Sequence, residues 1–85
     1  MSVFAIMCLD GRDEIQKKAN QLGLPLQNVA KEGLLVSFKG TSEELAAQLG
    51  ISEGQTGRAV VISISSYYGF APQSLWEWIN VHWND

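Results

Sequence analysis

The chain has 85 residues, a formal net charge of −3 and 46% hydrophobic residues, which suits one small domain, residues 1–85, with an ordered core. Its single cysteine, Cys8, excludes an internal disulfide, and one Cys with one His cannot supply the four ligands of a structural zinc site. Because the chain is acidic and its basic residues are scattered, nucleic acid is not an expected partner.

The N-terminal stretch MSVFAIMCLDGRDE lacks the basic start and the small-residue cleavage site of a signal peptide. No apolar run approaches the roughly 20 residues that span a membrane. We therefore expect a cytoplasmic protein with no membrane partner.

The first half of the chain predicts a strand, a helix and a hairpin. Val3–Leu9 is continuously apolar, which is typical of a strand buried on both faces. Asp10 follows it and is placed to cap a helix over Arg12–Leu22, whose apolar residues share one stripe. Leu26–Ala30 predicts a weak strand and Leu34–Lys39 a stronger one, with a short connection between them.

The second half predicts a helix, a strand and a final helix. Thr41 with Glu44 three residues later is a capping-box pattern for a helix over Ser42–Leu49, and Gly50 followed by Ile51 fits a Schellman ending. Arg58–Tyr68 carries the strongest strand pattern in the chain. After a bend marked by Gly69 and Pro72, Gln73–Trp83 predicts a helix with little polar surface.

The resulting order, β-α-β-β-α-β followed by an aromatic C-terminal helix, predicts an α+β fold of the ferredoxin-like kind. In this fold an antiparallel four-stranded sheet carries two helices on one face. Because the first and last strands are apolar on both faces, we expect them to be the central strands of the sheet.

The stretch from Tyr67 to Trp83 holds six of the eight aromatic residues of the chain. We expect these residues to cover the sheet face that the two helices leave bare, since an exposed apolar face of that size is uncommon in monomers. Three arrangements are open: a homodimer in which two sheets meet, a monomer whose last helix covers its own sheet, and a heterologous partner. We favour the homodimer. The predicted interface residues are Tyr67, Tyr68, Phe70, Trp76, Trp78 and Trp83.

The strand VFAIMCLD and the closing segment YYGFAPQSLWEWI, together with the ferredoxin-like order, resemble the small SinR-like proteins. More distantly they resemble the small CRISPR-associated proteins that partner the spacer integrase. The resemblance implies a dimer with facing sheets. In the CRISPR-associated family, an Asp that closes the first strand lies near the dimer axis and binds a divalent metal for nucleic-acid cleavage. Asp10 is the residue that matches this position, and Mg²⁺ is the implied ion.

Few residues could carry chemistry. Asp10 is either a helix cap or one half of a metal site across a dimer axis, and Asp13 and Glu14 could assist only in the second case. Cys8 is expected to be buried and inert, and His82 to interact with the end of the last helix.

Two functions are therefore considered. The favoured one is a non-enzymatic interaction module, a homodimer that binds a macromolecular partner as an antitoxin, an immunity protein or a regulator does. It needs no cofactor. The alternative is a metal-dependent endonuclease, or a degenerate relative, that uses Asp10 and Mg²⁺.

Overall fold

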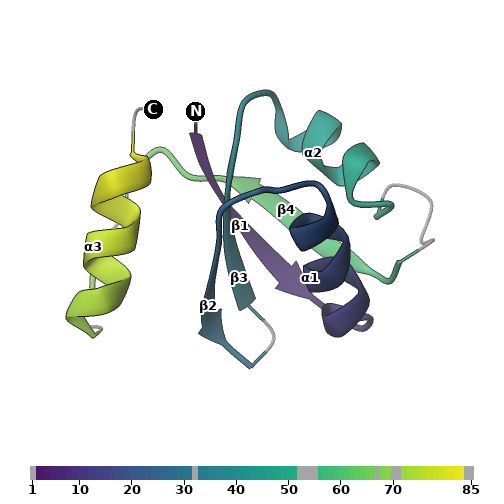
Figure 1. The fold of residues 1–85 in the computed structure, drawn as a ribbon, viewed down its shortest axis with the longest axis horizontal. Helices are drawn as coiled ribbons and strands as arrows, with labels where there is room; N and C mark the ends of the chain where they lie inside the picture. The colour runs from purple at the N-terminus through teal and green to yellow at the C-terminus, as the bar shows by residue number, and fades with distance from the viewer. Residues whose placement is uncertain (1, 32, 52–55, 67, 70–71, 84–85) are drawn as a thin grey trace.

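The computed structural model describes residues 2–31, 33–51, 56–66, 68–69 and 72–83. Along these residues the chain forms a small α+β fold with a four-stranded antiparallel sheet and three helices (Figure 1). The elements are β1 (Ser2–Cys8), α1 (Arg12–Gln21), β2 (Leu26–Ala30), β3 (Gly33–Phe38), α2 (Ser42–Gln48), β4 (Ala59–Ser63) and α3 (Gln73–His82).

The sheet order is β2-β3-β1-β4, so β1 and β3 are the central strands. The expectation that the last strand is central was wrong, because among the described strands β4 pairs with β1 alone and forms an edge. β4 is also shorter than predicted and ends at Ser63. Exposed and half-buried residues alternate along Ala59–Ile62 of β4, because Ala59 and Val61 face the core under α2 while Val60 and Ile62 lie on the other face.

One face of the sheet meets α1 and α2 and forms the larger core. From β1 the side chains of Phe4 and Ile6 lie in it, both 1% exposed or less. Ile15 of α1 and Leu45 of α2 are fully buried against them. This face uses the even-numbered residues of β1, as the two-residue repeat of a strand requires.

The ends of α2 follow the predicted local signals. Thr41 Oγ1 accepts a hydrogen bond from the Glu44 amide at 3.1 Å, and Glu44 Oε1 accepts one from the Thr41 amide at 2.9 Å. At the other end the amide of Ile51 donates to the Ala46 carbonyl at 2.9 Å, beyond a left-handed Gly50. The capping box and the Schellman ending are therefore confirmed.

The opposite face of the sheet meets α3, which lies apart from α1 and α2 (Figure 1). Ile79 of α3 is buried together with Val3 of β1 and Leu35 of β3. Trp76, Trp78 and Trp83 pack around this cluster and are half-buried. The last helix thus covers part of its own sheet, which is the arrangement expected for the monomer. Among the described residues no helix is long and apolar enough to cross a membrane.

Truncating Ile79 to Ala should loosen α3 from the sheet. Truncating a buried Leu, Ile or Met side chain to Ala typically lowers the unfolding free energy by about 2–5 kcal/mol. Because all three tryptophans lie in or beside α3, we expect the unfolding free energy to fall and the tryptophan emission to shift to the red. Urea unfolding followed by fluorescence measures both.

Val81→Ala is the matched control, because the Val81 side chain lies on the same helix and is 65% exposed. It should change the unfolding free energy by no more than about 0.5 kcal/mol. Equal losses for the two variants would contradict the packing of α3 through Ile79.

Candidate functional site

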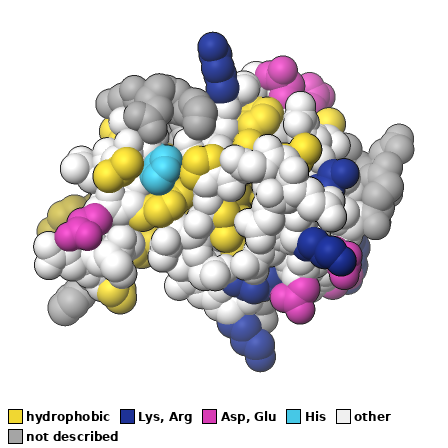
Figure 2. Space-filling model, in the orientation of Figure 1, with side chains coloured by type: hydrophobic (Ala, Val, Ile, Leu, Met, Phe, Trp, Pro, Cys, Tyr) yellow, Lys and Arg dark blue, Asp and Glu magenta, His cyan; other side chains and the backbone are white. Residues whose placement is uncertain are grey.

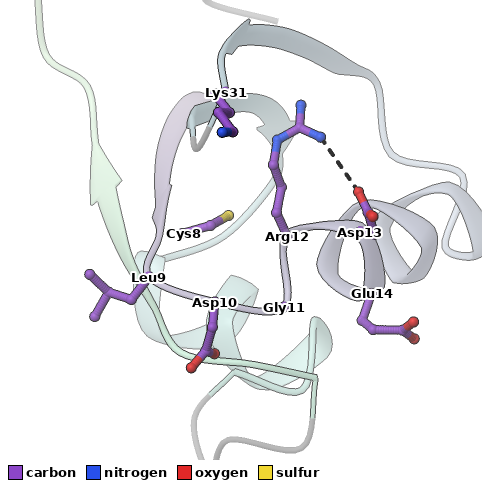
Figure 3. A pocket seen from close by; sticks show the side chains of 8 residues that line it. All are labelled: Cys8, Leu9, Asp10, Gly11, Arg12, Asp13, Glu14 and Lys31. Carbon is purple, nitrogen blue, oxygen red and sulfur yellow. Dashed lines mark ion pairs between the residues drawn. The ribbon is translucent and has the colours of Figure 1, made fainter.

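The residues that could carry chemistry lie where β1 ends and α1 begins. A pocket of about 450 Å³ lies there (Figure 3). A second hollow of about 490 Å³ adjoins it and shares Cys8, Leu9 and Lys31 with it. The residues that line the first pocket are Cys8, Leu9, Asp10, Gly11, Arg12, Asp13, Glu14 and Lys31.

Asp10 does not cap α1, so the predicted capping role was wrong. The cap position is taken by Gly11, which has a left-handed backbone with φ 67°. The Asp10 carboxylate instead binds Arg58, the residue directly before β4. Oδ1 accepts from the Arg58 amide at 2.6 Å, and Oδ2 accepts from Arg58 Nε at 2.7 Å. The side chain of Asp10 is therefore engaged across 48 residues of sequence.

These contacts stabilise the ionised form of Asp10. The hydrogen bond from the Arg58 amide, followed by the one from its guanidinium, holds the pKa of the Asp10 carboxyl below its usual value. The carboxylate is thus an ionised partner of Arg58 at neutral pH. A general acid or base needs a pKa close to the working pH, and Asp10 is shifted away from it.

Two glycines allow the backbones beside this ion pair to touch. A Cβ placed on Gly57 would lie 2.6 Å from the Asp10 carbonyl oxygen, and one placed on Gly11 would lie 2.3 Å from the Thr56 carbonyl oxygen. Both glycines have positive φ, 150° and 67° respectively, which side chains disfavour. Close contact and backbone conformation together restrict these two positions to glycine.

The carboxylates near Asp10 do not converge. Asp10 points away from Asp13 and Glu14, and Asp13 lies 3.8 Å from the Arg12 guanidinium instead (Figure 3). Among the described residues no group of three or more His, Cys, Asp or Glu side chains could hold a metal ion. The described residues around Asp10 within one chain therefore do not fit a Mg²⁺ site. A site shared between two chains stays a prediction.

The surroundings of Cys8 and His82, the remaining candidates for chemistry, indicate structural roles. Cys8 is buried, and this burial raises the pKa of its thiol, against a smaller opposite effect of Arg12. A protonated thiol is a poor nucleophile. His82 Nδ1 donates a hydrogen bond to the Trp78 carbonyl at 2.8 Å, and its ring stacks at a tilt on that of Trp78. His82 therefore interacts with the backbone of the last turn of α3, as expected.

The predicted interface residues do not share one environment. Tyr68 is fully exposed, whereas the three tryptophans pack against the sheet. Tyr67 and Phe70 lie outside the described residues. Figure 2 shows hydrophobic side chains gathered around His82, where α3 meets the rest of the molecule.

The sheet face under α3 is covered only in part. Met7, Val60 and Ile62 project from that face and are 57%, 51% and 42% exposed. Met7 of β1 stands opposite Val60 of β4 in the sheet, and Ile62 follows Val60 on the same face. We call these three residues the uncovered strip. The sequence predicted an apolar second face but not which part of it α3 would leave open.

Arg58 and Gly57 were missed in the sequence. Their proximity to Asp10 could be predicted only from the pairing of β1 with β4. The two strands run antiparallel with Leu9 opposite Arg58, and the Leu9 amide donates a hydrogen bond to the Arg58 carbonyl at 2.8 Å. This register places the residue after Leu9 beside Arg58.

Comparison with known proteins gives no relative: no protein-family model, curated protein or solved structure matches the chain.

Replacing Asp10 with Asn should make the protein less stable at neutral pH, because Asn cannot form the ion pair with Arg58. The folded-state pKa of Asp10 is lowered, so its contribution is fully present above the ordinary aspartate pKa of 3.8 and is lost as the pH falls through the lower folded value. The difference in unfolding free energy between wild type and Asp10→Asn should therefore shrink below about pH 4.

Urea unfolding at several pH values measures this difference. Asp13→Asn is the control, because it removes the same charge from a side chain that is 96% exposed. A difference for Asp10→Asn that is independent of pH would contradict the assigned role.

Replacing Gly57 with Ala should separate the two backbones. Gly69→Ala is the control, since Gly69 has a similar φ of 157° but its nearest neighbour would lie 4.0 Å from an added Cβ. Both variants should lose about 1–3 kcal/mol from the backbone conformation. Gly57→Ala should lose at least about 1 kcal/mol more through overpacking, as thermal or urea unfolding would measure. Equal losses would show that the contact with Asp10 is not tight.

Proposed function

We propose that the chain is a small non-enzymatic interaction module, which forms a homodimer and binds a macromolecular partner. The observation that carries this proposal is the uncovered strip, which leaves apolar side chains of β1 and β4 exposed on the face that α3 covers only in part. Exposed apolar patches of this kind mark interaction surfaces.

The electrostatic character of the chain supports a basic partner. The net charge of −3 favours association with a positively charged surface, as in an antitoxin, an immunity protein or a regulator that masks one. The single thiol, buried in the core, suits a reducing compartment, so the cytoplasm is the proposed location.

We also propose that the fold is ferredoxin-like with α3 added. The chain order β-α-β-β-α-β and the antiparallel sheet with β1 and β3 in the centre support it, as does the placement of α1 and α2 on one face. A relationship to the SinR-like and CRISPR-associated proteins is likewise a proposal, supported by the motifs quoted above and by this element order.

The alternative, a metal-dependent endonuclease, gains no support from the described residues around Asp10. Both carboxylate oxygens already accept hydrogen bonds from Arg58, and the neighbouring carboxylates point elsewhere. Cleavage of labelled RNA or DNA that depends on Mg²⁺ and is abolished by Asp10→Ala would favour the nuclease over the interaction module.

Light scattering behind a sizing column, over a dilution series, tests the proposed dimer. We expect twice the chain mass of 9.4 kDa at high concentration, with dissociation on dilution. A mass of one chain at every concentration would contradict the homodimer and favour the monomer whose last helix covers its own sheet, with any partner being a different protein.

A further inference from the structure

The two edges of the sheet differ in how they meet solvent. β2 carries the features that keep an edge strand from pairing: Pro25 precedes it, a register shift lies between Asn28 and Ala30, and Lys31 follows. β4 has no such register shift and no proline beside it, and the charged residue directly before it, Arg58, is paired with Asp10. Its sequence AVVIS contains no charge, proline or glycine, and its register with β1 runs regularly from Phe4–Ser63 to Cys8–Ala59. β4 is therefore the edge that is open to another strand.

The hydrogen bonds between the β4 segment and β1 show which backbone groups of this segment face β1. The Leu9 amide donates to the Arg58 carbonyl, and the Ile64 amide donates to the Val3 carbonyl at 3.2 Å. Residues 58 and 64 thus direct their backbone groups toward β1. Because these groups alternate along a strand, the N–H and C=O groups of Ala59, Val61 and Ser63 point away from the sheet.

The neighbouring helices leave this edge accessible. α2 contacts β4 on the face of the larger core, and α3 contacts mainly β1 and β2. The exposed fractions of Val60 and Ile62 agree with this placement. The free edge of β4 and the uncovered strip are therefore parts of one continuous surface.

We propose that β4 pairs antiparallel with β4 of a second copy of this chain, about a two-fold axis at Val61, to form an eight-stranded sheet. This inference rests on the proposed homodimer and specifies its surface. The outward groups of Val61 meet those of Val61 in the second copy, and Ala59 faces Ser63 of the second copy. All five residues of β4 are paired in this register, and a two-fold axis makes each contact occur twice.

The side chains fit this register. Val60 stands opposite Ile62 of the second copy at a position without backbone hydrogen bonds, where the Cα atoms approach to about 4.5 Å and side chains pack most closely. Both copies then place their exposed apolar residues in one cluster, with Met7 of each chain beside it. No like charges meet, since β4 is uncharged and Arg58 is held by Asp10.

The size of the surface indicates a weak dimer. A strand pair of five residues with a short apolar strip falls near or below the roughly 1,200 Å² of total buried area at which stable interfaces begin. We therefore expect a dissociation constant of the order of micromolar, which a dilution series can resolve.

Charge substitutions at the proposed pair test the register. V60K/I62K places Lys opposite Lys twice and should raise the dissociation constant at least about tenfold. V60K/I62E removes a comparable apolar area but places Lys opposite Glu twice, and it should return the constant to within a few-fold of wild type. V81K, at an exposed site on α3, is the control for added charge and should leave the constant unchanged. Light scattering measures the constants, and circular dichroism confirms that each variant is folded.

Cysteine cross-linking provides a second measurement that tolerates a loss of affinity. On a C8A background, a mixture of V60C and I62C chains should form a disulfide-linked pair faster than either variant alone. The two positions lie directly opposite each other only between different variants, at a Cα separation that a disulfide spans.

The outcomes separate the two proposals. A wild-type chain that is monomeric at every concentration would overturn the homodimer itself. A wild-type dimer whose dissociation constant V60K/I62K leaves unchanged would retain the homodimer and overturn pairing through β4. Disruption by V60K/I62K without recovery in V60K/I62E, or equal cross-linking of mixed and single variants, would overturn the proposed register.

Discussion

β1 is hydrogen-bonded to a strand on each side and carries apolar side chains on both faces, so every layer of the molecule is built against it. Phe4, Ile6 and Cys8 pack under α1 and α2, while Val3 packs under α3. A strand in this position cannot slip by one residue, because a slip would exchange the two faces and expose both cores. The alternation of β1 therefore determines which face each helix covers and where the uncovered strip lies.

The Asp10–Arg58 ion pair secures the end of β1 on which this arrangement depends. Its guanidinium contact is exposed to solvent, where ion pairs contribute little by themselves. The contact to the Arg58 amide is different, since it satisfies a backbone donor just before β4 begins. Together with the touching glycines, it keeps the turn before α1 and the start of β4 in contact. We therefore interpret Asp10 as a structural residue that joins two strands.

The sequence predicted what depends on neighbours along the chain. The helices, the capping box at Thr41 and the ending at Gly50 were found correctly, because each is formed by residues within five positions of one another. The place of β4 in the sheet depends on pairing between residues 51 to 59 positions apart, and its apolar character on both faces suggested a central strand. An edge strand with an apolar outer face looks like a buried strand when only its own residues are considered.

The same limitation explains the error at Asp10. A carboxylate directly before a helix is a frequent cap, so the local signal was reasonable. Arg58 competes for it from a distant segment, and Gly11 takes the cap position instead. The tryptophans were predicted as interface residues, and within one chain they pack between α3 and the sheet. Their contact with a second chain stays a prediction, because a pattern of apolar residues is the same whichever chain covers them.

The unequal edges of the sheet have a consequence for assembly. A sheet with two open edges has a valence of two and can grow without limit into a fibre. Here the register shift between Asn28 and Ala30, with Pro25 before the strand, disfavours pairing at the β2 edge, whereas β4 pairs regularly with β1. In the proposed dimer the β4 edges are used up by each other, so the assembly has a valence of one and stops at two chains.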